Sequence, residues 1–101
     1  MTVNKLIKSL QSYYKYYESQ IYFEDAIPIV DYVYTKEMGF LLFADDDAKT
    51  RVTPHELLID LHKVWNKEDT VLVIVDNCSY TPISINSRKY PDEPGYLNIT
   101  C

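Results

Sequence analysis

The order of structural signals along the chain constrains the fold most, because a helix signal followed by strand signals occurs twice. Thr2 and Thr53 each precede an amphipathic pattern, and strand-forming residues follow both patterns. When the halves are aligned, matching residues recur in the same order, with length changes only at turns. The matches are Thr2 with Thr53, Leu6 with Leu57, Ile7 with Leu58, Leu10 with Leu61, Tyr14 with Trp65, Asp25 with Asp76, Pro28-Ile29 with Pro82-Ile83, and Gly39-Phe40-Leu41 with Gly95-Tyr96-Leu97.

Apolar spacing and capping residues predict the two helices. Residues 2–17 carry one apolar helix face, and Thr2 serves as the N-cap. That face consists of Val3, Leu6, Ile7, Leu10 and Tyr14. In the second half Thr53 is the cap, Pro54 takes the first helical position and Glu56 completes a capping box. The second apolar face consists of Leu57, Leu58, Leu61 and Trp65.

Six segments carry strand signals, because β-branched and aromatic residues are concentrated in them. The predicted strands are residues 21–23, 27–34, 40–43, 70–75, 80–87 and 96–101. The uninterrupted apolar run over 70–75 predicts a strand that is buried on both faces or central in its sheet. Residues 36–39 predict a hairpin turn in which Gly39 supplies a positive φ, and residues 91–95 predict a further turn.

These elements predict an α+β fold, a tandem pseudo-repeat of two αβββ units whose helices pack on antiparallel sheet. Unit one covers residues 1–44, a charged linker covers 45–52, and unit two covers 53–101. A unit of about 50 residues buries too little surface to be stable alone. We therefore expect a single domain, residues 1–101, in which the units share a core or a continuous sheet.

The second half contains the pattern Thr-x-x-Glu-Leu-Leu-x-x-Leu, then a Val/Ile strand that ends in Asp, a Pro-Ile strand and a Gly-Tyr-Leu strand. The residues that form it are Thr53, Glu56, Leu57, Leu58, Leu61, residues 71–76, Pro82, Ile83, Gly95, Tyr96 and Leu97. This pattern resembles short uncharacterised αβββ-type proteins of bacteriophages and other mobile elements. The resemblance implies an accessory protein that binds and inhibits a host factor, and it carries over no site residues.

Composition argues against several classes of function. The chain has 10 Lys and Arg against 15 Asp and Glu, and the net charge of −5 disfavours direct contact with nucleic-acid phosphates. No run of about 20 apolar residues could span a membrane, and no secretion signal is visible. Cys78 and Cys101 are too few for a disulfide scaffold and favour reduced thiols. We expect a protein of the cytoplasm of a bacterial host cell.

We predict no catalytic residue, no cofactor and no metal site, and so a protein that is not an enzyme. Two glycines cannot build a Gly-rich phosphate loop. The three aspartates at residues 45–47 lack the spacing of a calcium loop. His55 and His62 lie on one predicted helix about 10 Å apart along its axis, too far for one metal to bridge them.

The 10 tyrosines are the unusual feature of the composition. Tyr14 and Tyr17 continue the apolar face of the first helix and are expected in the core. Tyr13 and Tyr16 project elsewhere and are expected at the surface, where tyrosine is common in protein interfaces. Acidic residues beside them would complement a basic partner.

These features predict a small non-catalytic protein-binding protein with a Tyr-rich acidic surface, a phage-type, anti-CRISPR-like inhibitor of a host factor such as a defence nuclease. The predicted partner-binding residues are Tyr13, Tyr16, Glu24 and Asp31. The expected partner is a host protein such as a nucleic-acid-binding enzyme, with no direct contact to nucleic acid or membrane. The alternative is a nucleotide- or small-ligand-sequestering oligomer, an anti-defence sponge, in which tyrosines stack on the ligand and Lys15 or Arg88 meets phosphate. Self-association into a homo-oligomer is left open.

Overall fold

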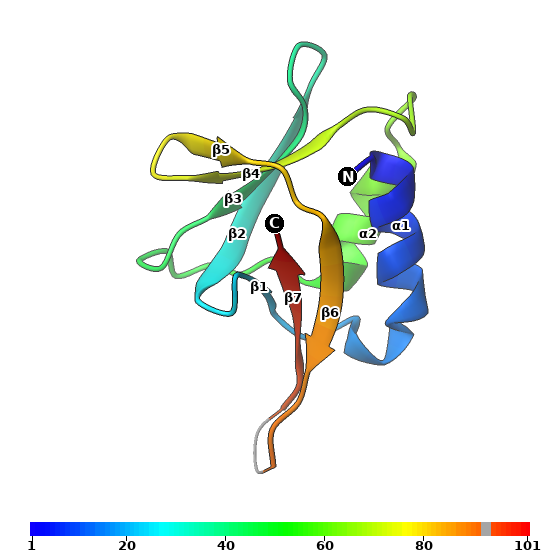
Figure 1. Ribbon diagram of the computed structural model, residues 1–101. Coiled ribbons are helices and arrows are strands. Elements are labelled where there is room, and N and C mark those ends of the chain that lie inside the picture. Colours follow the sequence, from blue (N-terminus) through cyan, green and yellow to red (C-terminus); the bar gives the residue numbers. More distant parts are fainter. Residues whose placement is uncertain (92–93) are drawn as a thin grey trace.

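The computed structural model describes residues 1–91 and 94–101, and within them it has two α-helices, one short 3₁₀ helix and seven strands (Figure 1). In chain order they are α1 (Val3–Ser12), η1 (Tyr14–Tyr16), β1 (Ile21–Phe23), β2 (Ile27–Thr35), β3 (Gly39–Ala44), α2 (Pro54–His62), β4 (Val71–Val75), β5 (Cys78–Tyr80), β6 (Ser84–Arg88) and β7 (Tyr96–Thr100). The α+β class is confirmed. The turn predicted over residues 91–95 includes residues 92 and 93, which lie outside the described residues.

Both helices begin at the predicted caps. The Lys5 N–H donates a hydrogen bond to Thr2 Oγ1 at 3.2 Å. At α2 the Glu56 N–H donates to Thr53 Oγ1 at 3.3 Å, and the Thr53 N–H donates to the Glu56 carboxylate at 2.9 Å. These bonds satisfy N–H groups that have no acceptor within the first helical turn.

The helices end earlier than predicted, which moves two aromatic side chains out of the core. α1 ends at Ser12, and η1 continues with about three residues per turn instead of 3.6. Tyr14 therefore leaves the apolar face and is 64% exposed. α2 ends at His62, so Trp65 lies beyond it and is 96% exposed. The prediction that Tyr14 and Trp65 extend the helix faces is wrong, because helical periodicity stops before both.

All seven strands form one sheet in the order β5-β4-β3-β2-β1-β7-β6. The pairs β3–β4 and β1–β7 are parallel, and the other four pairs are antiparallel. The prediction of an antiparallel sheet is therefore wrong for two pairs. α2 connects β3 to β4 as a crossover, which makes that pair parallel, and the other parallel pair joins strands from the two ends of the chain.

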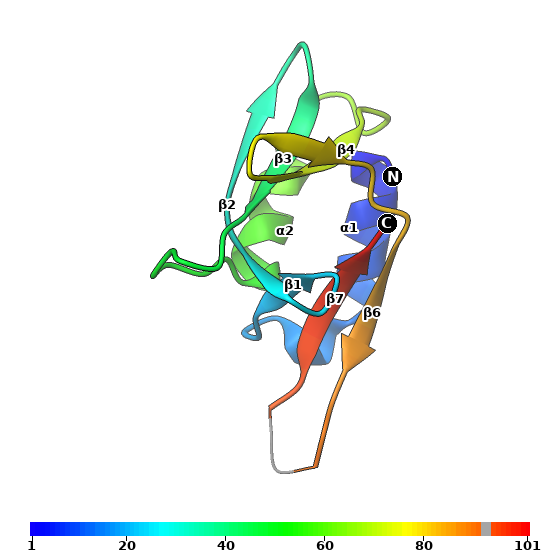
Figure 2. The same ribbon diagram turned by 60° about the vertical axis from the view of Figure 1, so that its left-hand side comes forward.

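The sheet curls until its edges approach each other. β5 and β6 lie at opposite edges, yet only residues 81–83 separate them in the chain, a span of at most about 14 Å. The ring centroids of Phe23 on β1 and Tyr80 on β5 lie 5.6 Å apart across the curl. Figures 1 and 2 show both helices on the same side of the sheet, inside this curl.

β2 bends so that it belongs to both halves of the sheet. Its beginning pairs with β1, where Phe23 lies opposite Ile27, and its remainder pairs with β3. The register shifts between Ile29 and Asp31, and a bulge of this kind bends a strand.

One apolar core lies between the helices and the sheet, and both halves of the chain contribute to it. Its fully buried large side chains include Leu6, Leu10, Ile21, Ile29, Phe40, Leu42, Leu57, Leu61, Val71, Leu97 and Ile99. The second half has one strand more than predicted, because the predicted strand over 80–87 is interrupted at residues 81–83. Pro82 lies in this interruption and has no N–H to donate to a neighbouring strand.

Candidate functional site

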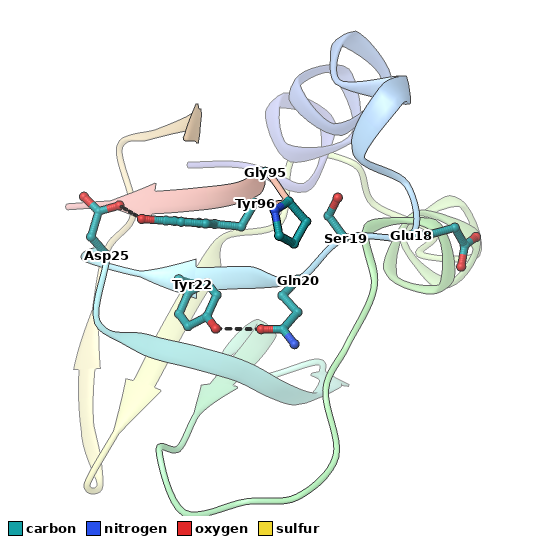
Figure 3. A pocket seen from close by; sticks show the side chains of 8 residues that line it. Glu18, Ser19, Gln20, Tyr22, Asp25, Gly95 and Tyr96 are labelled. Atoms are coloured by element: carbon teal, nitrogen blue, oxygen red, sulfur yellow. Dashed lines mark hydrogen bonds between the residues drawn. The ribbon is translucent and has the colours of Figure 1, made fainter. Parts of the chain in front are cut away.

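A pocket with two tyrosines opens on the outer face of the β1–β7 pair and has a volume of about 640 Å³ (Figure 3). We call it the tyrosine pocket. Its lining residues are Glu18, Ser19, Gln20, Tyr22, Asp25, Pro94, Gly95 and Tyr96. The Tyr22 hydroxyl donates a hydrogen bond to Gln20 Oε1 at 2.6 Å. A cavity of this size accommodates a small ligand or a side chain of a protein partner.

Strand alternation directs both pocket tyrosines outward. Ile21 and Phe23 are buried in the core, so Tyr22 between them points to the opposite face of β1. Leu97 is buried in the same way, which turns the neighbouring Tyr96 outward from β7. The ring centroids of Tyr22 and Tyr96 lie 4.9 Å apart in an edge-to-face arrangement that stabilises the pair.

Asp25 is the polar centre of one wall of the pocket. The Tyr96 hydroxyl donates to Asp25 Oδ1 at 3.0 Å, and Arg88 Nε lies 3.3 Å from the same oxygen. The Asp25 N–H donates to Asn98 Oδ1 at 2.6 Å. Because Asn98 is fully buried on β7, this bond fixes the turn between β1 and β2 against the strand that carries Tyr96.

The pocket has a negative charge balance. Among the described residues, its lining includes the carboxylates of Glu18 and Asp25 and no Lys or Arg, and the Asp25 carboxylate is paired with Arg88 from outside the lining. Desolvation, followed by hydrogen bonds with Asp25 and Tyr90, raises the pKa of Tyr96 to about 12, so its hydroxyl stays a neutral donor at physiological pH. The pocket therefore favours a cation over an anion.

Tyr13 and Tyr16, which were predicted to be exposed, are half-buried against the core. The Tyr13 hydroxyl donates to the Ile85 carbonyl at 3.3 Å, and the two tyrosine rings meet edge-to-face with centroids 6.2 Å apart. Tyr16 packs so closely against Gly95 that a Cβ there would lie 2.5 Å from Tyr16 Cε1. The prediction of exposure is wrong, because the end of α1 and the 3₁₀ helix after it bring the Tyr13 ring to β6 and the Tyr16 ring to the start of β7. Tyr16 thereby supports a wall of the tyrosine pocket.

Glu24 and Asp31, the predicted acidic contacts, belong to different surfaces. Glu24 is exposed beside Asp25 in the turn after β1, and its carboxylate accepts a hydrogen bond from the Cys101 N–H at 2.7 Å. Asp31 is exposed on β2 and lines a separate groove with Phe43. Of the four predicted residues, Tyr16 contacts the tyrosine pocket through Gly95, whereas Glu24 and Asp31 are not among its lining residues.

The remaining candidates for chemistry are dispersed. His55 and His62 are exposed on α2, and the half-buried Tyr17 packs near the His55 ring with centroids 5.9 Å apart. Cys78 and Cys101 are exposed free thiols. Within residues 1–91 and 94–101, no group of three or more His, Cys, Asp or Glu is placed to hold a metal ion.

Sequence reasoning missed Tyr22, Tyr96 and Asp25 as members of one site. Tyr22 between two apolar residues in a predicted strand does indicate an outward ring. The parallel pairing of β1 with β7 had no local signal, because it joins residues from opposite ends of the chain.

Comparisons with models of protein families, with curated proteins and with solved structures find no match. In the part of the chain that the structure describes, no helix is long and apolar enough to cross a membrane.

Proposed function

We propose that this chain is a small non-catalytic protein-binding protein, a phage-type inhibitor of a host nucleic-acid-binding enzyme such as a defence nuclease, and that the tyrosine pocket contacts the partner. The observation that carries the proposal is the placement of two outward tyrosine rings beside the Asp25 carboxylate, with Glu18 at the other end of the same pocket (Figure 3). Tyrosine is enriched where proteins bind one another, because its ring packs while its hydroxyl bonds.

The pocket suits a Lys or Arg side chain of the partner. Tyr22 and Tyr96 offer aromatic rings on which a cation is stabilised, and Glu18 offers negative charge. Asp25 already accepts the guanidinium of Arg88 from its own chain at 3.3 Å. Enzymes that act on nucleic acid carry such basic side chains in their substrate grooves, so occupying those side chains would block the substrate.

The alternative is sequestration of a small ligand, which the volume of about 640 Å³ and the two rings favour. The carboxylates of Glu18 and Asp25 oppose a phosphate-bearing ligand, and Arg88 is already paired with Asp25. If the chain sequesters a small ligand, the chemistry of the pocket therefore supports a neutral or cationic one.

A matched pair of charge reversals tests the protein-binding proposal. Glu18 and Glu37 are both exposed, but only Glu18 lines the pocket. We expect the tagged chain to retain one stoichiometric protein from a nuclease-treated bacterial lysate. Glu18→Lys should reduce that capture about tenfold, a change of about 1.4 kcal/mol, and Glu37→Lys should leave it unchanged. Equal capture by all three chains would refute the pocket as the contact, whereas extra small-molecule mass without a protein would favour sequestration.

We also propose that the chain is a tandem repeat of two αβββ units, and matching strand pairs support this. In the parallel pair β3–β4, Phe40 lies opposite Val71, and in the parallel pair β7–β1, Leu97 lies opposite Ile21. In each pair the last strand of one half lies beside the first strand of the other. Such an exchange is expected when two equivalent units share one sheet.

The starts of the two helices support the same proposal. The Asn4 N–H at the start of α1 donates to the carbonyl of Lys67, which follows α2, at 2.8 Å. The His55 N–H at the start of α2 donates to the carbonyl of Tyr17, which follows α1, at 3.0 Å. Each helix is thus anchored to the loop after the other.

A further inference from the structure

Two neighbouring strands are apolar on both faces, although the helices cover only one face. β3 reads Gly-Phe-Leu-Leu-Phe-Ala and β4 reads Val-Leu-Val-Ile-Val. Phe40, Leu42, Val71 and Val73 from these strands belong to the core beneath the helices. Strands with such continuous apolar runs are typical of sheets that are covered on both faces.

The face turned away from the helices carries its own apolar cluster, in which Leu41 is buried among half-buried neighbours. Cross-strand pairing places Val33, Leu41 and Leu72 in one row across β2, β3 and β4. Phe43 and Ile74 form the next row. Leu41 is 6% exposed and lies outside the core cluster, whereas Val33 at the side of the cluster is 45% exposed. We call these five side chains the outer apolar face.

Aspartates surround one end of the outer apolar face. A groove of about 630 Å³ begins at Phe43 and Ile74 and extends over the loops that follow β3 and β4. Its acidic lining residues are Asp31, Asp45, Asp47 and Asp76, and within residues 1–91 and 94–101 its lining includes no Lys, Arg or His. The groove and the tyrosine pocket have no lining residue in common.

We propose that the outer apolar face binds a protein partner that presents a row of apolar side chains flanked by Lys or Arg. Apolar burial would supply affinity, and the four aspartates would select and orient a basic partner. A second copy of this chain fits poorly, because a symmetric contact would bring the same aspartates together. Nucleic acid and anionic lipid surfaces carry the same sign of charge as the groove and are disfavoured. The proposal is independent of the function proposed for the tyrosine pocket.

Two synthetic amphipathic helical peptides test this proposal on the full chain. One peptide has an apolar Leu stripe flanked by Lys, and the other has the same stripe flanked by Glu. We expect the Leu/Lys peptide to bind and to shift the backbone NMR signals of Val33, Leu41, Leu72 and Ile74. The Leu/Glu peptide should bind at least about tenfold more weakly.

Val33→Lys and Ile59→Lys form a matched pair of variants, because both add one positive charge at apolar positions that are 45% and 47% exposed. Val33→Lys lies on the outer apolar face and should weaken binding of the Leu/Lys peptide about tenfold, whereas Ile59→Lys on α2 should not. Asp31→Asn with Asp47→Asn should flatten the salt dependence of binding.

Three results would overturn the proposal. The first is that peptide-induced NMR shifts lie elsewhere on the chain, and the second is that both lysine variants weaken binding equally. The third is that the chain alone sediments as a dimer that Val33→Lys dissociates, because a second copy would then cover this face.

Discussion

The hydroxyl of Tyr32 on β2 donates a hydrogen bond to the carboxylate of Asp60 on α2. The Tyr32 ring stacks on Phe40 with centroids 5.6 Å apart, and Lys63 Nζ lies 3.2 Å from Asp60 Oδ1. This pair is a direct polar link between the β2–β3 hairpin and the second helix. This hydrogen bond fixes the orientation of α2 relative to the β2–β3 hairpin more strictly than apolar packing alone would.

We expect Tyr32→Phe to lower the free energy of unfolding by about 1 kcal/mol. The variant keeps the ring that stacks on Phe40 and loses only the hydroxyl, so the loss reports its hydrogen bonds to Asp60 and, at 3.4 Å, to the Glu56 carbonyl. Urea denaturation at pH 7 measures the difference. Tyr14→Phe removes a hydroxyl from a tyrosine that is 64% exposed and serves as the control.

The hydrogen bond between Tyr32 and Asp60 predicts that the free energy of unfolding depends on pH. The hydrogen bond from Tyr32, and then that from Lys63, lower the pKa of Asp60 below its ordinary value of 3.8. A carboxyl group whose pKa is lower in the folded state stabilises the fold above its unfolded pKa, and this stabilisation is lost as pH falls through the folded pKa. The free energy of unfolding of wild type should therefore exceed that of Tyr32→Phe by the whole amount at pH 7 and by less at pH 2. An equal difference at both pH values would contradict this assignment.

Gly39→Ala should destabilise the chain by more than about 2 kcal/mol. Gly39 has φ of 94°, and a Cβ at this position would lie 2.3 Å from the Thr70 carbonyl oxygen. That oxygen also accepts a hydrogen bond from the Phe40 N–H at 2.9 Å, so the backbone there has little freedom to move. Gly95→Ala is the comparison, because Gly95 does not have a positive φ and its Cβ would lie 3.2 Å from the nearest backbone atom, the Arg88 carbonyl oxygen, although 2.5 Å from the Tyr16 ring. Thermal and urea denaturation of both variants should rank Gly39→Ala as the more severe.

Local signals predicted local structure well in this chain. The capping box of Thr53 and Glu56 and the positive φ of Gly39 depend on residues within a few positions, and the structure has both. The strands of the first half were predicted to within a residue or two at each end for the same reason. The continuous apolar run over residues 70–75 also correctly indicated a strand inside the sheet, because β4 has a neighbouring strand on each side.

These local signals do not predict which strands pair when the strands are far apart in the chain. The pairing of β1 with β7 assembles the tyrosine pocket from Tyr22 and Tyr96, which are far apart in the chain. Tyr14 and Trp65 were misplaced, because apolar spacing continues past the points at which the two helices end. A change of helical period rotates every later side chain, so one early helix end reversed several predictions of exposure.

Alkaline pH should destabilise the fold through Tyr96. Its pKa is raised from the ordinary 10.0 to about 12, so the folded state retains a proton that the unfolded state releases. The resulting stabilisation is complete below pH 10 and is lost as pH rises toward 12. Tyr96→Phe should therefore show a smaller fall in the free energy of unfolding between pH 9 and pH 11 than wild type. The same fall in both proteins would mean that other tyrosines carry the effect.

The two ends of the chain lie near each other, which allows the repeat proposal to be tested by permutation. The Ile83 N–H donates to the Thr100 carbonyl at 2.7 Å, and the Ile83 carbonyl accepts a hydrogen bond from Lys5 Nζ at 3.0 Å. Residues near both termini thus contact the same segment, as the position of the chain ends in Figure 2 also shows.

A permuted chain that begins at Thr53, and that joins Cys101 to Met1 through a copy of residues 45–52, should fold. If the two halves are equivalent units, this copy connects β7 to α1 as the original segment connects β3 to α2. We expect a cooperative thermal transition within about 10 °C of that of the natural order. A permutant opened at Ser79 interrupts the β4–β5 hairpin and should be clearly less stable. A Thr53 permutant that is unfolded, or no more stable than the Ser79 permutant, would show that the two halves are not interchangeable in order.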